Sequence, residues 1–211
     1  MSISENIAAI RQRMTEAARR VGRHPEGIAL MAVSKTHPPD RIRDAYNAGL
    51  RLFGENRVQE FAGKAAALAD LAEASWHMIG HLQTNKAGKA AELFSAVDSV
   101  DSVKLAEKLN AAARTLGKQL NVLIEINVGG EGAKSGVAPD SPELEELLLA
   151  APRLESLRFR GLMTVPPFTD DPQEARPFFR RLREFRDTIA ARKLPGEIGR
   201  ASCRERVFAV V

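Results

Sequence analysis

The chain has 211 residues, of which 31 are basic, 27 are acidic and 44% are hydrophobic. This length suits one sizeable hydrophobic core, and the net charge of +4 is spread along the chain, so it makes no strong case for nucleic acid. A single cysteine, Cys203, excludes an internal disulfide framework and a cysteine-rich zinc site. Neither a signal peptide nor an apolar run long enough to span a bilayer is visible, and we therefore expect a cytoplasmic protein.

Helical and strand patterns alternate from the start of the chain. Apolar residues recur every three or four positions over 7–21, which predicts an amphipathic helix that ends before a glycine. The uninterrupted apolar run 28–33 predicts a buried parallel strand, and the prolines after it open a second helix that Gly49 ends. A short strand at 52–53 and an alanine-rich helix at about 58–71 come next.

The second half of the chain continues this alternation. Strands are predicted at 76–80, 95–100, 120–128 and 159–165, and helices after residue 86 and at about 103–117, 142–150 and 174–192. The buried side of the last helix is assigned to Phe178, Phe179, Leu182, Phe185 and Ile189. Six strand–helix units without hairpin signals predict a parallel sheet with right-handed crossovers.

Chemically versatile residues follow several different strands rather than one. They are Lys35, Asn56, His81, Asp98, Lys134 and the pair Met163 and Thr164. An open doubly wound sheet would concentrate such residues at one switch point, whereas a (β/α)8 barrel gathers them around a central mouth. The distribution favours the barrel.

Lys35 directly follows the predicted strand 28–33, at the carboxyl edge of the sheet where α/β folds keep their chemistry. An amine held beside an apolar wall loses its proton more easily and can form a Schiff base with a carbonyl compound. Most lysines are solvated, however, so this position alone also suits a surface lysine after a core strand.

Five motifs in order resemble one family. They are Val33–Thr36, Phe53–Asn56, Trp76–Lys86, Lys134–Gly136 and Gly161–Thr164. Together they are similar to the pyridoxal-phosphate homeostasis proteins, the YggS/PROSC family, from about residue 3 to about residue 194. The resemblance implies the barrel of the alanine racemase amino-terminal domain, a (β/α)8 TIM barrel of the fold-type III pyridoxal-phosphate class.

The resemblance also implies a function and a site. Lys35 would hold pyridoxal 5′-phosphate as an aldimine, Asn56 would lie near the ring or its hydroxyl, and His81 and Met163 would line the barrel mouth. Lys134 would be a second basic group there. The family is thought to buffer or deliver the cofactor without established catalytic turnover, so we expect a monomeric carrier in cofactor homeostasis, with no catalytic residues and with apo pyridoxal-phosphate enzymes as recipients.

Several of these residues also have purely structural interpretations. Asn56 could cap the helix that follows it, and His77, inside a strand, suits a core histidine better than a ligand. No histidine and carboxylate spacing indicates a metal site. The glycine-rich run 129–132 lacks the Gly-Lys-Ser/Thr ending of a P-loop and is interpreted as a flexible loop.

Three other functions compete with the carrier. A racemase-like enzyme needs a second acid–base group, in the racemases a tyrosine from an added domain, and the only tyrosine here is Tyr46 on an early helix. A cofactor-free Schiff-base aldolase would use Lys35 alone. A partner-binding scaffold would need a large exposed apolar patch, which the sequence does not show.

The C-terminal segment departs from the family pattern. We expect one barrel domain over 1–195 that lacks the last two βα units, followed by a non-family tail over 196–211 without a strand or helix. Because 197–207 can be back-translated into a sequencing-adapter read, we interpret the tail as an artefact on a truncated gene. The resulting expectations are two open strand edges, a strong tendency to aggregate and an incomplete cofactor pocket that binds weakly.

Overall fold

The structure is a computed structural model that describes residues 2–130, 135–192 and 205–210. These residues form two compact units, one comprising the chain up to residue 77 with the C-terminal strand, and the other comprising the chain from residue 78. Among the described residues, no helix is both long enough and apolar enough to cross a membrane.

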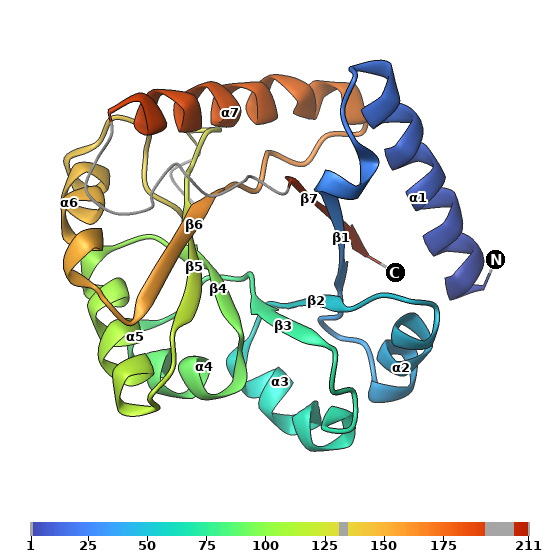
Figure 1. Cartoon of the computed structure of the whole chain (residues 1–211), viewed down its shortest axis with the longest axis horizontal. Helices are drawn as coiled ribbons and strands as arrows, with labels where there is room; N and C mark the ends of the chain where they lie inside the picture. Colours follow the sequence, from blue (N-terminus) through green and yellow to red (C-terminus); the bar gives the residue numbers. More distant parts are fainter. Residues whose placement is uncertain (1, 131–134, 193–204, 211) are drawn as a thin grey trace. The chain divides into compact units, whose positions relative to one another are not determined.

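The first unit is a parallel sheet with its helices on one side (Figure 1). Its main elements are α1 (Ile3–Arg20), β1 (Ile28–Val33), α2 (Pro39–Asn47), β2 (Leu52–Glu55), α3 (Val58–Ala65), β3 (Ser75–Met78) and β7 (Glu205–Val210). The strand order is β3-β2-β1-β7, and β1 runs parallel to both β2 and β7. This order places β1 between two strands.

Local signals set the ends of the first helices. Ser2 caps α1 in a capping box with Glu5, in which each residue accepts a hydrogen bond from the other's backbone N–H. Helix α2 starts directly after Pro38, and Gly49 follows its end with a φ of 88°, a left-handed conformation that favours glycine. The predicted start of α2 at the prolines and its predicted end at Gly49 are both confirmed.

The second unit has the same alternation. Its main elements are α4 (Ala87–Leu93), β4 (Ala96–Val100), α5 (Val103–Thr115), β5 (Leu120–Glu125), α6 (Pro142–Ala150), β6 (Leu157–Met163) and α7 (Arg176–Ala191). The strand order is β6-β5-β4, with parallel pairing throughout. All residues of β4 are buried, and Asn121 is the exposed residue of β5, as expected for strands covered on both faces. The α/β class predicted from the sequence is confirmed.

Several predicted elements differ in extent. Strand β5 ends at Glu125 instead of residue 128, because Ile126 next forms an isolated bridge to Val137. Helix α3 ends at Ala65 and continues as a 3-10 helix. In α7, Phe179 is 52% exposed, so its predicted burial is wrong, whereas Ile189 is buried as predicted.

The expectation that 196–211 contains no strand is wrong for residues 205–210. This segment is β7, and it pairs with the whole of β1, from Ile28 opposite Glu205 to Val33 opposite Val210. The pairing also corrects the expectation that this edge of β1 is open. Strand pairing depends on backbone N–H and C=O groups, which almost any sequence supplies, so side-chain patterns alone did not reveal it. The rest of the tail, 196–204 and 211, lies outside the described residues.

Candidate functional site

The ends of β1 and β2 remain in register beyond the last paired residues of the ladder. The Ser34 N–H donates to the Gly54 carbonyl at 2.9 Å, and the Ser34 hydroxyl donates to Glu55 Oε1 at 2.5 Å. Both side chains are buried, and Glu55 also forms an ion pair with Lys64 of α3. Ser34 and Glu55 therefore face α3 as cross-strand neighbours.

Lys35 and Asn56 are the next residues of these two strand ends. Lys35 begins the turn after β1 and Asn56 lies in the bend after β2, so both follow the ends of neighbouring parallel strands at equivalent positions. Both residues are half-buried. Among the described residues, neither the Lys35 amine nor the Asn56 amide has a hydrogen-bond or ion-pair partner. Two half-buried residues at neighbouring strand ends thus carry polar groups with unused bonding capacity.

Asn56 does not cap α3. Arg57 occupies the N-cap position and its side chain makes no capping hydrogen bond. This leaves the Asn56 side chain available for another role, and it removes the structural interpretation considered from the sequence.

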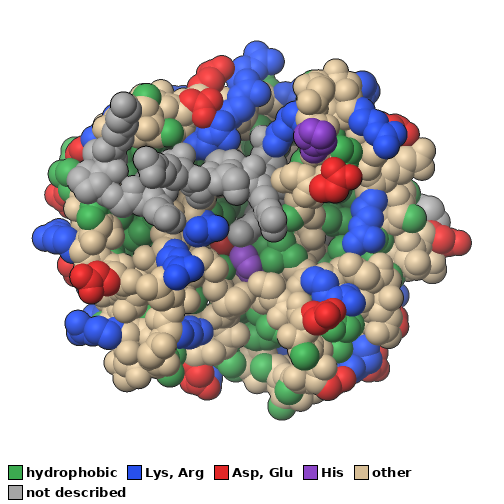
Figure 2. All heavy atoms as spheres, viewed as in Figure 1, with side chains coloured by type: hydrophobic (Ala, Val, Ile, Leu, Met, Phe, Trp, Pro, Cys, Tyr) green, Lys and Arg blue, Asp and Glu red, His purple; other side chains and the backbone are tan. Residues whose placement is uncertain are grey.

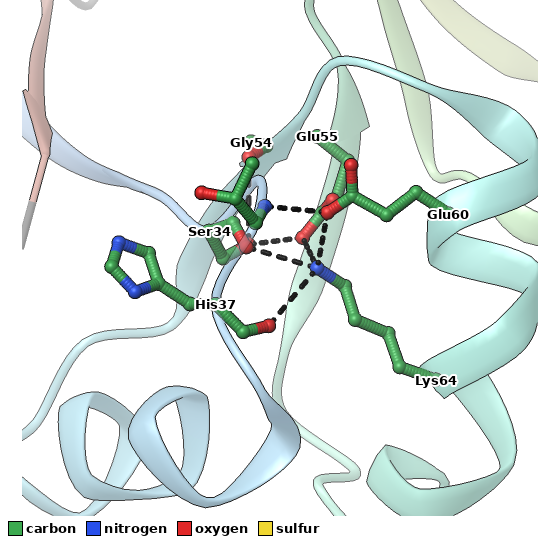
Figure 3. A network of polar contacts seen from close by, with 7 residues as sticks. Ser34, His37, Gly54, Glu55, Glu60 and Lys64 are labelled. Atoms are coloured by element: carbon green, nitrogen blue, oxygen red, sulfur yellow. Dashed lines mark hydrogen bonds and ion pairs between the residues drawn. The ribbon is translucent and has the colours of Figure 1, made fainter.

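A buried ammonium group anchors the turn that contains Lys35 (Figure 3). Lys64 Nζ donates to the Ser34 carbonyl at 2.9 Å and lies 2.9 Å from Glu55 Oε1 and 3.1 Å from Glu60 Oε1. A longer contact of 3.4 Å reaches the His37 carbonyl, whereas the His37 ring points away from the network. Lys64 is only 8% exposed, so these oxygens replace most of its hydration.

Glu60 extends the network to the other side of Lys35. Its Oε1 accepts the Thr36 N–H at 2.5 Å in addition to the contact with Lys64. Thr36 has a φ of 63°, a left-handed conformation that a β-branched residue rarely adopts. The carboxylate therefore helps to hold the backbone in a strained turn.

The two carboxylates of this network titrate in opposite directions. Burial raises the pKa of Glu55, and it outweighs the opposing hydrogen bonds from Ser34 and Lys64. Burial also acts upward on Glu60, but the hydrogen bonds from the Thr36 N–H and Lys64 lower the pKa of that residue. Glu55 Oε2 is buried without a hydrogen-bond partner among the described residues, which explains the penalty on its charged form.

Aromatic packing fixes α3 against the sheet. The ring of Trp76 in β3 stacks on Phe53 of β2 at 4.9 Å between centroids, and it contacts Phe61 of α3 at 4.8 Å. The adjacent His77 is 5% exposed and has an interaction partner, which confirms its interpretation as a core histidine. This packing keeps Lys64 beside the turn after β1.

The second unit contains its own row of polar residues at strand ends. His81 is exposed, and its Nδ1 lies 3.3 Å from Asp101 Oδ2, just after β4. Glu125 ends β5 and is 5% exposed, and its Oε1 accepts a hydrogen bond from the Ser135 hydroxyl at 3.3 Å. Met163 ends β6, is buried and pairs directly with Glu125 in the ladder. His81 and Met163 thus each lie next to a carboxylate, Asp101 for His81 and Glu125 for Met163.

The pKa of Glu125 departs from its ordinary value. Burial raises its pKa, the nearby negative charge of Asp101 acts in the same direction, and the Ser135 hydrogen bond and His81 oppose them. Its Oε2 has no hydrogen-bond partner among the described residues. Lys134, the remaining predicted site residue, lies outside the described residues.

A cavity of about 640 Å³ in the second unit includes Asp101. Its lining carries three further carboxylates, Glu107, Glu143 and Glu146, against one lysine, Lys104. This balance disfavours a phosphate ligand there. On the face shown in Figure 2, basic and acidic side chains are interspersed without a large region of one sign, as the even distribution of charge in the sequence suggested.

Sequence reasoning missed the groups that surround Lys35 and Met163. Glu55 was part of a recognised motif but was given no role, and Glu60, Lys64 and Glu125 were not considered. One signal was available, because Glu60 and Lys64 are spaced four residues apart and face the same side of α3. The burial of Lys64 depends on how α3 packs, which the local sequence does not reveal.

Comparison with known proteins first defines the class. The family model for the alanine racemase N-terminal domain matches residues 5–202. Among curated relatives, the pyridoxal phosphate homeostasis protein of Aquifex aeolicus is 42% identical over 189 residues, covering 90% of this chain and 82% of the relative. The pyridoxal phosphate homeostasis protein of Pseudomonas aeruginosa is 46% identical over 184 residues, covering 87% of this chain and 79% of the relative.

A solved structure agrees with this result. PipY of Synechococcus elongatus, in a structure with PLP bound, matches with a TM-score of 0.79 and 32% identity, covering 98% of this chain and 96% of PipY. The chain belongs to the pyridoxal phosphate homeostasis protein family, within the class of alanine racemase N-terminal domains.

Proposed function

We propose that this protein binds pyridoxal 5′-phosphate through Lys35 and acts in cofactor homeostasis as a carrier. The family membership supports the choice of cofactor, since the similar PipY structure holds PLP and the curated relatives are named for its homeostasis. When bound, the cofactor supplies an aldehyde that an unprotonated amine can attack.

The observation that carries the proposal is that Lys35 and Asn56 directly follow two neighbouring parallel strands. Lys35 is half-buried, and no described residue forms an ion pair or hydrogen bond with its amine. The neighbouring Asn56 amide is also without a described partner, so it can donate to or accept from a ring substituent. These two groups fit the aldehyde and the adjacent hydroxyl of the cofactor ring.

The remaining predicted contacts are part of the proposal on the strength of the resemblance. His81 and Met163 lie at strand ends in the second unit, and Lys134 follows β5 in the sequence. We propose all three as further cofactor contacts, each to be tested by its own substitution.

A racemase-like activity has less support. Tyr46 lies on α2, and the Arg51 guanidinium covers its ring at 4.0 Å from the centroid. This cation–π contact engages the tyrosine on the helix side of the unit instead of beside Lys35. A carrier needs no second acid–base group, whereas a two-base racemase does.

The proposal extends to partners and location. A carrier hands its cofactor to enzymes that lack it, so apo pyridoxal-phosphate enzymes are the proposed recipients and the cytoplasm is the proposed place of transfer. We further propose that the protein acts as a monomer, because one chain supplies both Lys35 and Asn56.

The test is an absorbance titration with pyridoxal phosphate on wild type, Lys35→Ala and the surface control Lys108→Ala. Wild type and Lys108→Ala should develop the same yellow adduct, and Lys35→Ala should develop none. A loaded wild-type protein should then restore activity to an apo enzyme that requires the cofactor. Equal adduct formation in Lys35→Ala would overturn the proposal, and loading without any transfer would overturn the carrier role.

A further inference from the structure

The backbone around Lys35 is held by one buried charge network. Lys64 Nζ donates to the carbonyl of Ser34, the residue before Lys35. Glu60 Oε1 accepts the N–H of Thr36, the residue after Lys35. Lys64 and Glu60 are themselves 3.1 Å apart, so α3 is connected to both sides of the reactive residue (Figure 3).

This connection acts on the backbone and leaves the Lys35 side chain untouched. Thr36 is in a left-handed conformation that costs free energy unless neighbouring groups maintain it. The hydrogen bond from its N–H to Glu60 is short, at 2.5 Å, and its acceptor has a lowered pKa, which keeps that acceptor ionised. Without this bond the turn can relax, and the Lys35 amine would sample many more directions.

Lys64 is unsuited to be the reactive amine itself. It is 8% exposed, and its amine is already engaged by the oxygens of Ser34, Glu55 and Glu60. An amine held in these contacts would have to break them before it could attack a carbonyl compound. Removing the Lys64 charge would leave Glu55 buried without its ion-pair partner, which makes Glu60 the cleaner position for a test.

We propose that Glu60 and Lys64 are positioning residues that hold the Ser34–Thr36 backbone so that the Lys35 amine is directed at its carbonyl partner. This inference rests on the proposed function, because the network is inferred to serve the covalent binding of the cofactor by Lys35. Positioning of this kind raises the equilibrium and rate of adduct formation without any contact between Glu60 and the ligand.

The test compares Glu60→Ala with the conservative Glu60→Gln and with Gln59→Ala, an exposed neighbour on α3. Glu60→Gln keeps an oxygen that can accept the Thr36 N–H, whereas Glu60→Ala removes it. Two readouts use the protein without cofactor: amide exchange of Thr36, and the pH dependence of Lys35 acylation measured by peptide mass mapping. The third is the dissociation constant of pyridoxal phosphate.

Glu60→Ala should exchange the Thr36 amide about tenfold faster or more and bind pyridoxal phosphate about tenfold more weakly, as expected for loss of a hydrogen bond to a charged group. Glu60→Gln should stay close to wild type in both Thr36 amide exchange and pyridoxal phosphate affinity. Gln59→Ala should match wild type in both quantities. Faster exchange with unchanged affinity and unchanged acylation of Lys35 would overturn the positioning role while leaving the proposed function intact. Unchanged Thr36 exchange in Glu60→Ala would overturn the network itself.

The cofactor-free readouts separate this inference from the proposed function. If wild type forms no adduct on Lys35, the proposed function fails. The exchange and acylation profiles of Glu60→Ala then still decide whether the network directs the Lys35 amine.

Discussion

The hydroxyl of Ser34 and Oε1 of Glu55 lie 2.5 Å apart, between the ends of two parallel strands. This contact shows that the register of β1 and β2 continues past the residues that form the regular ladder. Lys35 and Asn56 are the next residues along these two strand ends. The hydrogen bond between Ser34 and Glu55 therefore joins the residues that directly precede the candidate site.

Removal of the Ser34 hydroxyl should destabilise the protein. In Ser34→Ala, the buried Glu55 carboxylate loses one of its two partners, and we expect a decrease in the free energy of unfolding of about 1–2 kcal/mol. Denaturant unfolding followed by circular dichroism measures this change. The control is Thr115→Ala, whose exposed hydroxyl bonds within its own helix. An equal effect of both substitutions would show that the Ser34–Glu55 contact contributes nothing specific.

Asn56 should strengthen cofactor binding without being required for the covalent bond. Asn56→Ala removes a neutral hydrogen-bonding group, so we expect the dissociation constant of pyridoxal phosphate to rise about tenfold while the adduct on Lys35 still forms. Absorbance titration measures the constant, and borohydride reduction with peptide mapping locates the adduct. Unchanged affinity would mean that the Asn56 amide does not contact the ligand.

Glu125 should make stability depend on pH. Because its pKa in the folded state is raised above the ordinary value of 4.5, its protonated form stabilises the fold at low pH, and this contribution is lost as pH rises through the raised pKa. Glu125→Gln keeps an acceptor for Ser135 and carries no charge at any pH. The variant should therefore gain stability relative to wild type as pH increases above 4.5.

Urea unfolding from pH 5 to pH 8 measures this effect, with the exposed Glu107→Gln as the control. The difference between Glu125→Gln and wild type should grow with pH, and that of the control should stay flat. A constant difference for Glu125→Gln across this range would contradict the assignment of a raised pKa to Glu125.

The C-terminal strand should protect the edge of β1. Deletion of residues 204–211 removes the partner of Ile28–Val33, leaving backbone N–H and C=O groups along that edge unpaired. We expect a lower free energy of unfolding and more aggregation than in a control that lacks residue 211 only. Denaturant unfolding and light scattering measure the two quantities. Equal solubility and stability of the two variants would show that β7 is dispensable.

Much of the fold could be predicted because its signals are local. The prolines before α2 and the glycine after it mark the two ends of that helix, and α6 covers the range 142–150 that was predicted for it. The apolar runs of β1 and β5 indicated parallel strands because these strands are buried on both faces.

Features that depend on contacts between distant segments could not be predicted. The strand at 205–210 exists by pairing with β1, more than 170 residues earlier in the chain. The sequence around Lys64 is that of an ordinary exposed helix lysine. Its side chain is buried because α3 packs against the sheet through Phe61 and Trp76. For the site, the sequence suggested Lys35 and Asn56, whereas the charges that hold their surroundings became visible only in the structure.

The central claim is that Lys35, and not the buried Lys64, carries the cofactor. The most direct measurement is borohydride reduction of the wild-type protein with pyridoxal phosphate, followed by peptide mass mapping of every lysine. One reduced phosphopyridoxyl group is expected, located on the peptide that contains Lys35. A group on Lys64, or a spread over exposed lysines with none on Lys35, would contradict the assignment of Lys35.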